Sequence, residues 1–423
     1  MEINYKIHYI ARILFGKTGV SFAAGLLSLA FFNAPANAIG PTIGDLIAEN
    51  AITYNEHGLG NSLKDLSHLT PAQRGEGIST ILDQLERINA VPDGISEDVY
   101  STMSLLDGSF YGSLAMVNSM NHTVLNQQIS NQLRPKNYCN CFSDTCECCS
   151  PTKNLWAKYY NISGEFDPDG NAYGVDYDVN TVLIGGDRKL DSGDRLGGYF
   201  GYSGGSTKTF DRLEEADNND YIFGLYFLRT TESGYFLANT SWGFNDYKSD
   251  RDLPLYDYSE CNQGSANSNE FDLRFEKGWD FRIDSTKLEP FFGLQYLYSS
   301  YDSFDEEGNG ATPLNVQIED GNSLQSELGA RLIWADKPDR TRKTSLYVQG
   351  SWIHEYLDQC REISGRFRSA PASSANYTVR GLDPGSDFCN VGFGATGQWN
   401  RLTLFGSYDF LMNDLVFLPV GSF

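Results

Sequence analysis

Eight cysteines are the side chains of this sequence that are best suited to chemistry. Five lie in one short tract and three are distant: Cys139, Cys141, Cys146, Cys148, Cys149, Cys261, Cys360 and Cys389. Closely spaced thiolates suit zinc, but the Cys-x-Cys spacing and the lack of a nearby histidine fit zinc sites poorly. An odd number of cysteines in one tract requires a distant partner or leaves a free thiol. We therefore expect disulfides rather than a metal site, with Cys360 and Cys389 placed to close one long loop.

His354 and Glu355 are the pair that invites a catalytic interpretation. A hydrolase embedded in a membrane would need a serine nucleophile and a histidine on the same face. Adjacent residues of a strand point in opposite directions, so these two side chains cannot form a dyad by themselves. We expect no enzymatic activity and no cofactor.

Asp167, Asp169 and Asn171 alternate like the first oxygen ligands of a calcium loop. Such a loop also has Gly at its sixth position and Glu at its twelfth, where this sequence has Ala172 and Asp178. The segment is therefore predicted to be a solvated acidic loop without a metal.

Composition excludes several classes of protein. The 423 residues contain 32 Lys and Arg against 55 Asp and Glu, a net charge of -23, which argues against a nucleic-acid-binding protein. A mean hydropathy of -0.38 leaves room for at most one apolar membrane helix. The 42 Gly, 26 Phe and 25 Tyr are typical of extracellular all-β proteins and of outer-membrane barrels.

The N-terminus resembles a secretory signal. Basic residues precede the apolar run 20–32, and Ala36-Asn37-Ala38 is a small-residue cleavage site. The alternative is an uncleaved anchor, but this run is short for a bilayer. We expect residues 1–38 to be a signal peptide and the rest to be exported, so that the cysteines reach an oxidising compartment.

Residues 39–137 are predicted to be helical. Apolar residues recur at helical spacing over 78–88 after Thr70-Pro71, a second run covers 99–114 after Ser96, and a third helix covers about 116–133. The third is polar nearly all round, as in a solvated helix or one in a wet channel. Its amides are Asn118, Asn121, Asn126, Gln127, Gln128 and Asn131. A Cys-rich junction, 138–153, follows.

From residue 154 the hydrophobic period changes to two. In 236–245, aromatic and apolar residues alternate with Asn, Ser and Gly. Twelve strands are expected, near 154–165, 177–190, 195–206, 220–231, 235–248, 270–282, 287–301, 322–335, 344–358, 387–399, 402–412 and 415–423.

Connections between these strands alternate in length. Long ones are expected at 166–176, 207–219, 249–269, 302–321 and 359–386, with short or moderate ones between them. A soluble β-sandwich would show the same residue alternation, but this rhythm and the even strand count favour an antiparallel transmembrane β-barrel. The polar face would line its lumen, with Asp272, Arg274, Glu276, Glu327, Arg331 and Gln349 facing inward.

Residues 154–423 resemble the autotransporter β-domain, the translocator of type V secretion. The matching pieces are Leu155-Trp156-Ala157, the Gly-rich segments 185–188 and 196–203, the strand 323–329 and the segment 351–356. The terminal Phe423 resembles the assembly signal of such barrels. Pro419 and Gly421 depart from the family, and because proline cannot donate to a β-ladder we expect a weakened closure between the first and last strands.

The resemblance implies a mainly β fold, a 12-stranded barrel with a short α-helical N-terminal region, in the bacterial outer membrane. It implies that helix 116–133 threads the lumen, where its amides hydrogen-bond to the wall, and that barrel-assembly machinery and periplasmic chaperones insert the chain into outer-membrane lipid. We expect a monomer that moves or displays its short N-terminal segment. The alternative is a porin-like, structural or adhesive outer-membrane barrel without secretion activity.

Overall fold

The computed structural model describes residues 41–423, except for 90–93, 135–151, 284–285, 336–341 and 400–401. The expected signal peptide lies outside the described residues. So do the five clustered cysteines of the junction.

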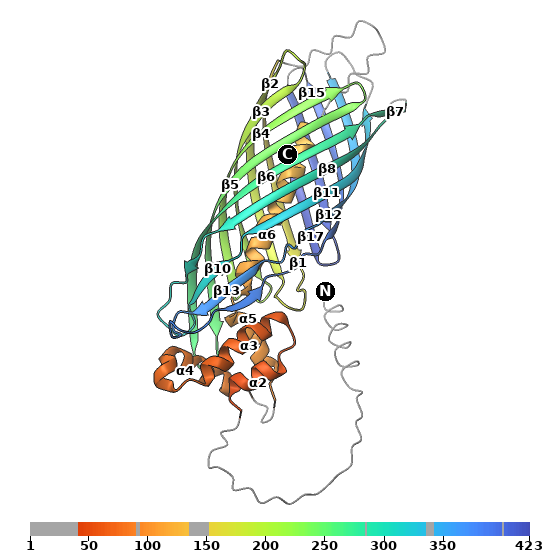
Figure 1. Cartoon of the computed structure of the whole chain (residues 1–423). Coiled ribbons are helices and arrows are strands. Elements are labelled where there is room, and N and C mark those ends of the chain that lie inside the picture. The colour runs from red at the N-terminus through yellow and green to blue at the C-terminus, as the bar shows by residue number, and fades with distance from the viewer. Residues whose placement is uncertain (1–40, 90–93, 135–151, 284–285, 336–341, 400–401) are drawn as a thin grey trace, which may run out of the picture. The chain divides into compact units, whose positions relative to one another are not determined.

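Twelve strands of the described chain close into an antiparallel barrel, as the sequence predicts (Figure 1). Successive barrel strands are hydrogen-bonded neighbours, and the last pairs with the first. They are β1 (Lys153–Phe166), β2 (Val175–Lys189), β3 (Arg195–Thr209), β4 (Glu214–Thr231), β5 (Gly234–Pro254), β6 (Ser259–Trp279), β8 (Thr286–Tyr301), β11 (Gly321–Ala335), β12 (Arg342–Glu355), β15 (Asp387–Trp399), β16 (Leu402–Met412) and β17 (Val416–Ser422). A short strand, β7 (Phe281–Ile283), adds to the edge beside β8.

The alternation of residues decides which face meets lipid. In β5, Trp242 and Phe244 are exposed on the outer surface, while Ser241 and Asn245 are buried inside. Because each strand shows the outside only every second residue, a chain with a hydrophilic average can still present an apolar belt.

Among the described residues, no helix is both long and apolar enough to cross a bilayer.

For two of the expected long loops the prediction is wrong, because the structure has strands there. The segment 249–269 is mostly strand, because β5 and β6 pair from Gly234↔Trp279 to Pro254↔Ser259 and leave only residues 255–258 as the turn. The connection expected at 207–219 shrinks in the same way to residues 210–213. Polar residues resemble a loop in sequence, but a β-ladder joins backbone groups and continues regardless of side-chain polarity.

Closure at Pro419 is achieved by a local gap in the ladder. The pairs Ile162↔Val420 and Glu165↔Phe417 share one register, and the two pairs between them are missing. One of these missing pairs would have involved Pro419, which has no N–H to donate. On the other side Pro419 is paired with Phe410 of β16. The predicted weakness is therefore confined to two residue pairs, and the barrel is closed.

The two longest connections form a second, four-stranded sheet at one end of the barrel. Its strands run in the order β14 (Tyr377–Arg380), β13 (Glu362–Phe367), β10 (Leu314–Ile318) and β9 (Phe304–Asp305). Parts of the expected loops 302–321 and 359–386 are therefore β-strands.

Five helices of the described region precede the barrel: α2 (Ile43–Asn50), α3 (Tyr54–Ser67), α4 (Pro71–Ile88), α5 (Glu97–Leu106) and α6 (Ser109–Leu133). Capping boxes at Thr42 and Thr53 start α2 and α3, which the periodicity did not predict. The polar helix begins at Ser109 rather than near 116, because Gly108 (φ 74°) adopts the left-handed conformation that ends the preceding turn.

Candidate functional site

Helix α6 occupies the lumen of the barrel (Figure 1). All of its residues except Gln132 are buried, polar and apolar ones alike. A helix that is polar on most sides would lose its hydration in an apolar core, so burial requires polar partners all around it. The barrel wall provides many of them.

Toward the middle of α6, carboxylates from the wall hold the helix. Asn118 Nδ2 donates to Glu270 Oε1 at 2.5 Å, and His122 Nδ1 lies 2.5 Å from Asp272 Oδ2. Asn126 Nδ2 donates to the other oxygen of Asp272 at 3.0 Å. Three successive turns of α6 are thus tied to neighbouring residues of β6.

The other ring nitrogen of His122 faces two more carboxylates. Its Nε2 lies 3.8 Å from Asp220 Oδ2 and 4.0 Å from Glu270 Oε2, and all of these side chains are inaccessible to solvent. No group of three His, Cys, Asp or Glu side chains in the described part of the chain has the geometry of a metal site. The cluster places one imidazole among three carboxylates.

Arginines from both the helix and the wall dominate the other end of the lumen. Arg134, the residue after α6, binds Glu276 through two bonds of 2.6 and 2.9 Å. Arg274 donates to Glu276 at 2.8 Å and to Glu327 at 2.5 Å. Arg331 donates to Asn131 Oδ1 at 2.6 Å. Bidentate arginine pairs of this kind fix orientation as well as position.

A third set of contacts comes from the strands near the closure. Gln128 Nε2 donates to Asp409 Oδ2 at 3.3 Å, and Lys158 Nζ donates to the Gln128 carbonyl at 3.0 Å. Gln349 Nε2 completes the set with Asp409 Oδ1 at 2.7 Å.

The side chains predicted for the lumen are all buried: Asp272, Arg274, Glu276, Glu327, Arg331 and Gln349. Of the six predicted helix amides, Asn118, Asn126, Gln128 and Asn131 contact the wall. Asn121 and the Gln127 amide nitrogen are also buried, but they have no hydrogen-bond partner among the described residues.

Sequence reasoning missed several residues of this interface. They are His122, Arg134, Lys158, Glu270 and Asp409. Both faces of the first strand carry apolar side chains, and the buried face includes Trp156, Tyr160 and Ile162, so periodicity did not single out Lys158. A histidine surrounded by polar helix residues likewise has no local signal.

The catalytic candidates are separated by the wall. His354 faces outward and lies 2.9 Å from Asp387, whereas Glu355 is buried and accepts from Ser323 Oγ at 2.6 Å. Residues 201–205 match the Gly-x-Ser-x-Gly pattern of a nucleophile elbow. However, Ser203 lies inside β3, and its hydroxyl is 2.7 Å from that of Thr181. Such an elbow requires a strand-to-helix turn, which is not found here.

The acidic segment after β1 binds the helical region. Asp169 Oδ1 accepts from the amides of Asn171 and Ala172, and its other oxygen accepts from Asp383 N at 3.0 Å. The Asn171 carbonyl in turn accepts from the Asn55 side chain of α3. The same side chain donates to the Arg380 carbonyl at 2.8 Å and accepts from the Arg380 amide at 2.7 Å. The segment 167–171 thus forms part of the surface on which helix α3 packs.

Two further contacts hold helices α2 to α5, hereafter the cap, on the long connections. Arg87 of α4 lies 2.6 Å from Asp257 at the tip of the β5–β6 hairpin. Arg251 of β5 donates to the Leu105 carbonyl at 2.6 Å and pairs with Glu306 through bonds of 2.8 and 2.6 Å. Figure 1 shows the cap at the end of the barrel where β10 and β13 lie.

The joint between the cap and α6 contains a buried acid. Asp107 Oδ1 accepts from the Ser109 amide at 2.7 Å. Burial raises the pKa of this carboxyl to about 7, although the Ser109 hydrogen bonds and the charge of Arg251 oppose the rise.

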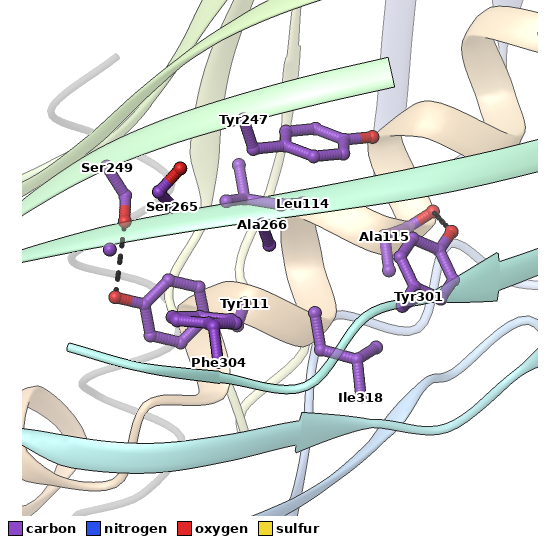
Figure 2. Close-up of a pocket in the computed structure, with 11 residues that line it drawn as sticks. Tyr111, Leu114, Ala115, Tyr247, Ser249, Ser265, Ala266, Tyr301, Phe304 and Ile318 are labelled. Atoms are coloured by element: carbon purple, nitrogen blue, oxygen red, sulfur yellow. Dashed lines mark hydrogen bonds between the residues drawn. The ribbon is translucent and has the colours of Figure 1, made fainter. Parts of the chain in front are cut away.

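A small apolar cavity remains beside the first turns of α6. Figure 2 shows it between α6 and strands of the wall, with the rings of Tyr111, Tyr247, Tyr301 and Phe304 around it. Two of the tyrosine hydroxyls have partners in this view: Tyr111 accepts from Ser249 Oγ at 3.2 Å, and Tyr301 donates to the Ala115 carbonyl at 3.3 Å. The cavity is packing space rather than a polar binding site.

The three cysteines within the described residues, Cys261, Cys360 and Cys389, are free thiols. The loop-closing disulfide between Cys360 and Cys389 is therefore not formed. Burial raises the pKa of Cys360, which lies in the connection after β12, to about 12.

Comparison with known proteins identifies relatives of the barrel. The family model described as autotransporter β-domain matches residues 155–409. An extracellular serine protease of Serratia marcescens is 27% identical over 220 residues, which is 52% of this chain and 21% of the relative. A putative uncharacterized protein of Escherichia coli K12, YaiT, is 20% identical over 218 residues, 50% of this chain and 21% of that protein.

The chain spans about a fifth of the length of these curated relatives. Among solved structures, the translocator domain of the autotransporter NalP from Neisseria meningitidis matches with a TM-score of 0.55 and 14% identity, over 74% of this chain and 96% of that chain. At this identity the likeness concerns the fold alone.

Proposed function

The chain belongs to the autotransporter β-domain family, and from that premise we propose that it carries its own cap to the cell surface and holds it there on α6. The family implies the bacterial outer membrane. The translocator fold is not itself catalytic, and no reaction is assigned to this chain. What travels is a short helical bundle, residues 41–106.

One observation carries the proposal: the cap and the N-terminal end of α6 lie at the barrel end with the long connections. Outer-membrane barrels place their long loops outside the cell and their short turns in the periplasm. The chain therefore enters the lumen on the outer side at Ser109 and leaves it on the periplasmic side after Leu133. In this orientation, residues 41–106 are extracellular.

The polar lining of the lumen suits this passage. A chain in transit exposes backbone and polar side chains, and a wall of carboxylates, arginines and amides offers them partners at every level. Once α6 has formed, its backbone groups satisfy one another, and the pairs His122–Asp272 and Arg134–Glu276 hold the helix. The lumen is then closed by the segment that passed through it.

Assembly would follow the family. We propose that periplasmic chaperones and the barrel-assembly machinery insert the chain as a monomer, with Phe423 as the signal. In support, Phe423 exchanges two backbone bonds of 2.8 Å with Tyr159 of β1, so the terminal residue takes part in closing the barrel.

Surface accessibility on intact cells tests the proposal. We would insert one epitope beside Ile52, which is 72% exposed between α2 and α3. A matched epitope would stand after Asp191, in the exposed β2–β3 turn at the opposite end of the barrel. Antibody should bind the first on intact cells and the second only after the outer membrane is permeabilised.

The reverse pattern would support the alternative, a porin-like or structural barrel whose helical region stays in the periplasm. Binding at neither site in cells that hold the folded barrel would also count against display.

A further inference from the structure

Arg361 is a buried cation with part of its hydrogen-bonding capacity unused. It lies in the connection between β12 and β13, and only 5% of it is exposed. Its Nη1 donates to the Asp358 carbonyl at 3.0 Å, but Nε and Nη2 have no partner among the described residues. Buried charges are normally paired, because burial strips them of water. An unpaired guanidinium edge inside a protein therefore requires an explanation.

The backbone of Arg361 is fixed, so the side chain is not a stray surface group. Its carbonyl accepts from Gly381 N at 3.1 Å. Helix α6 packs directly on this point, since a Cβ on Gly112 would stand 2.8 Å from the Arg361 carbonyl oxygen. The backbone that carries this guanidinium is thus held at the rim of the lumen by both the loop and the helix.

Gly321 forms a seat for the guanidinium. A Cβ at this position would lie 2.2 Å from Cζ, 2.3 Å from Nε and 2.4 Å from Nη2 of Arg361. Gly321 does not have a positive φ, so its backbone does not require glycine. The missing side chain therefore makes the room that the guanidinium occupies, and the two unpaired donors lie next to this backbone.

A third donor lies beside the seat. Ser299 stands directly opposite Gly321 in the β8–β11 ladder and is fully buried. Its hydroxyl also lacks a partner among the residues that the structure describes. Cross-strand neighbours have Cβ positions about 5 Å apart, so one small ligand can reach both groups.

The nearby carboxylates are engaged elsewhere. Glu355 accepts from Ser323 Oγ at 2.6 Å and from Leu324 N at 2.9 Å, and Asp320 accepts from Tyr298 at 2.8 Å. Neither supplies the missing partner of Arg361.

We propose that Arg361, seated on Gly321 and assisted by Ser299, binds a small oxyanion at the outer rim of the lumen. Nε and Nη2 are parallel donors along one edge of the guanidinium, the geometry that matches two oxygens of one carboxylate or phosphate group. The anion supplies the acceptors that both donors lack, and it stabilises the joint between α6 and the loop that carries β13.

Thermal unfolding of the full folded chain in detergent tests the site. Formate and inorganic phosphate are titrated in separate arms, each against sodium chloride at equal ionic strength. A ligand that binds only the folded state raises Tm saturably, here by about 2–4 °C. The arm with the larger rise identifies the preferred oxyanion.

Three variants locate the effect. R361Q removes the cation and G321A fills the seat, so both should lose the rise. R212Q removes an exposed arginine of the β3–β4 turn and should keep it. Each variant must first migrate as a folded, heat-modifiable barrel on a gel.

No rise beyond that with chloride in the wild type, or an equal rise in R361Q, would overturn the proposal. Retention of the rise in G321A would also overturn it, because the oxyanion would then bind away from the seat.

Discussion

His122 Nδ1 lies 2.5 Å from Asp272 Oδ2 inside the barrel, and both side chains are fully buried. The two residues are 150 positions apart in the chain. Asp272 also accepts from Asn126 at 3.0 Å and from Ser241 at 3.3 Å, so it joins two turns of α6 to β5 and β6. This carboxylate is the central anchor of the lumen helix.

Truncating His122 should strongly destabilise the folded barrel. His122→Ala leaves the buried Asp272 carboxyl without the imidazole that lies 2.5 Å from it, a loss of about 1–3 kcal/mol. Denaturant unfolding in lipid vesicles measures it. His68→Ala is the matched control, because His68 makes a similar 2.9 Å contact with Asp45 but its side chain is 58% exposed. The control should lose less than about 1 kcal/mol. Equal losses in the two variants would contradict the anchoring role.

Deleting residues 116–133 should raise pore conductance in planar bilayers, because this segment fills the lumen. The open pore should also prefer cations, since Asp220, Glu270 and Asp272 then lose their shared partner His122. Adding Asp272→Asn to the deletion should weaken that preference without closing the pore. Unchanged conductance on deletion would contradict a helix that plugs the barrel.

Asn55→Ala should loosen the cap without unfolding the barrel. The Asn55 side chain makes three bonds of 2.7 to 3.2 Å to the backbone of Asn171 and Arg380. Losing them costs about 1–2 kcal/mol and should speed proteolysis of the cap about tenfold while the barrel stays resistant.

Asn50→Ala is its control, because the Asn50 side chain donates within α2, to the Leu46 carbonyl at 2.9 Å, and makes no other hydrogen bond with the described residues. Cap cleavage at the same rate in the two variants would show that Asn55 does not hold the cap in place.

Stability should fall as pH rises from about 4 to about 7, through Asp107. Its folded pKa of about 7 exceeds the ordinary value of 3.8, so within this window the folded state holds a proton that the unfolded state releases. The contribution is fully present below about pH 4 and is lost by about pH 7. Asp107→Asn should reduce this slope.

Denaturant midpoints measured across the pH series check the Asp107 slope. The exposed Asp65→Asn serves as control and should keep the wild-type dependence. An unchanged slope in Asp107→Asn would assign the pH dependence to other groups.

The strands were predictable because their signal is local. In β5, the alternation of Trp242 and Phe244 with Ser241 and Asn245 follows from the pleat of a single strand. The polar character of α6 was likewise visible residue by residue. Loop length was less predictable, since the extensions of β5 and β6 past the apolar belt have polar residues that resemble a loop.

By itself, the sequence determined the number of strands, their inward and outward faces and the presence of a polar helix upstream. Only the tertiary structure decided which wall residue meets which turn of that helix, as in His122 with Asp272 or Arg134 with Glu276. The reason is physical. Periodicity is encoded within one element, whereas these contacts depend on the register of twelve closed strands and on the rotation of α6 inside them. The seating of Arg361 on Gly321 and the docking of Asn55 on Arg380 depend on that same closure.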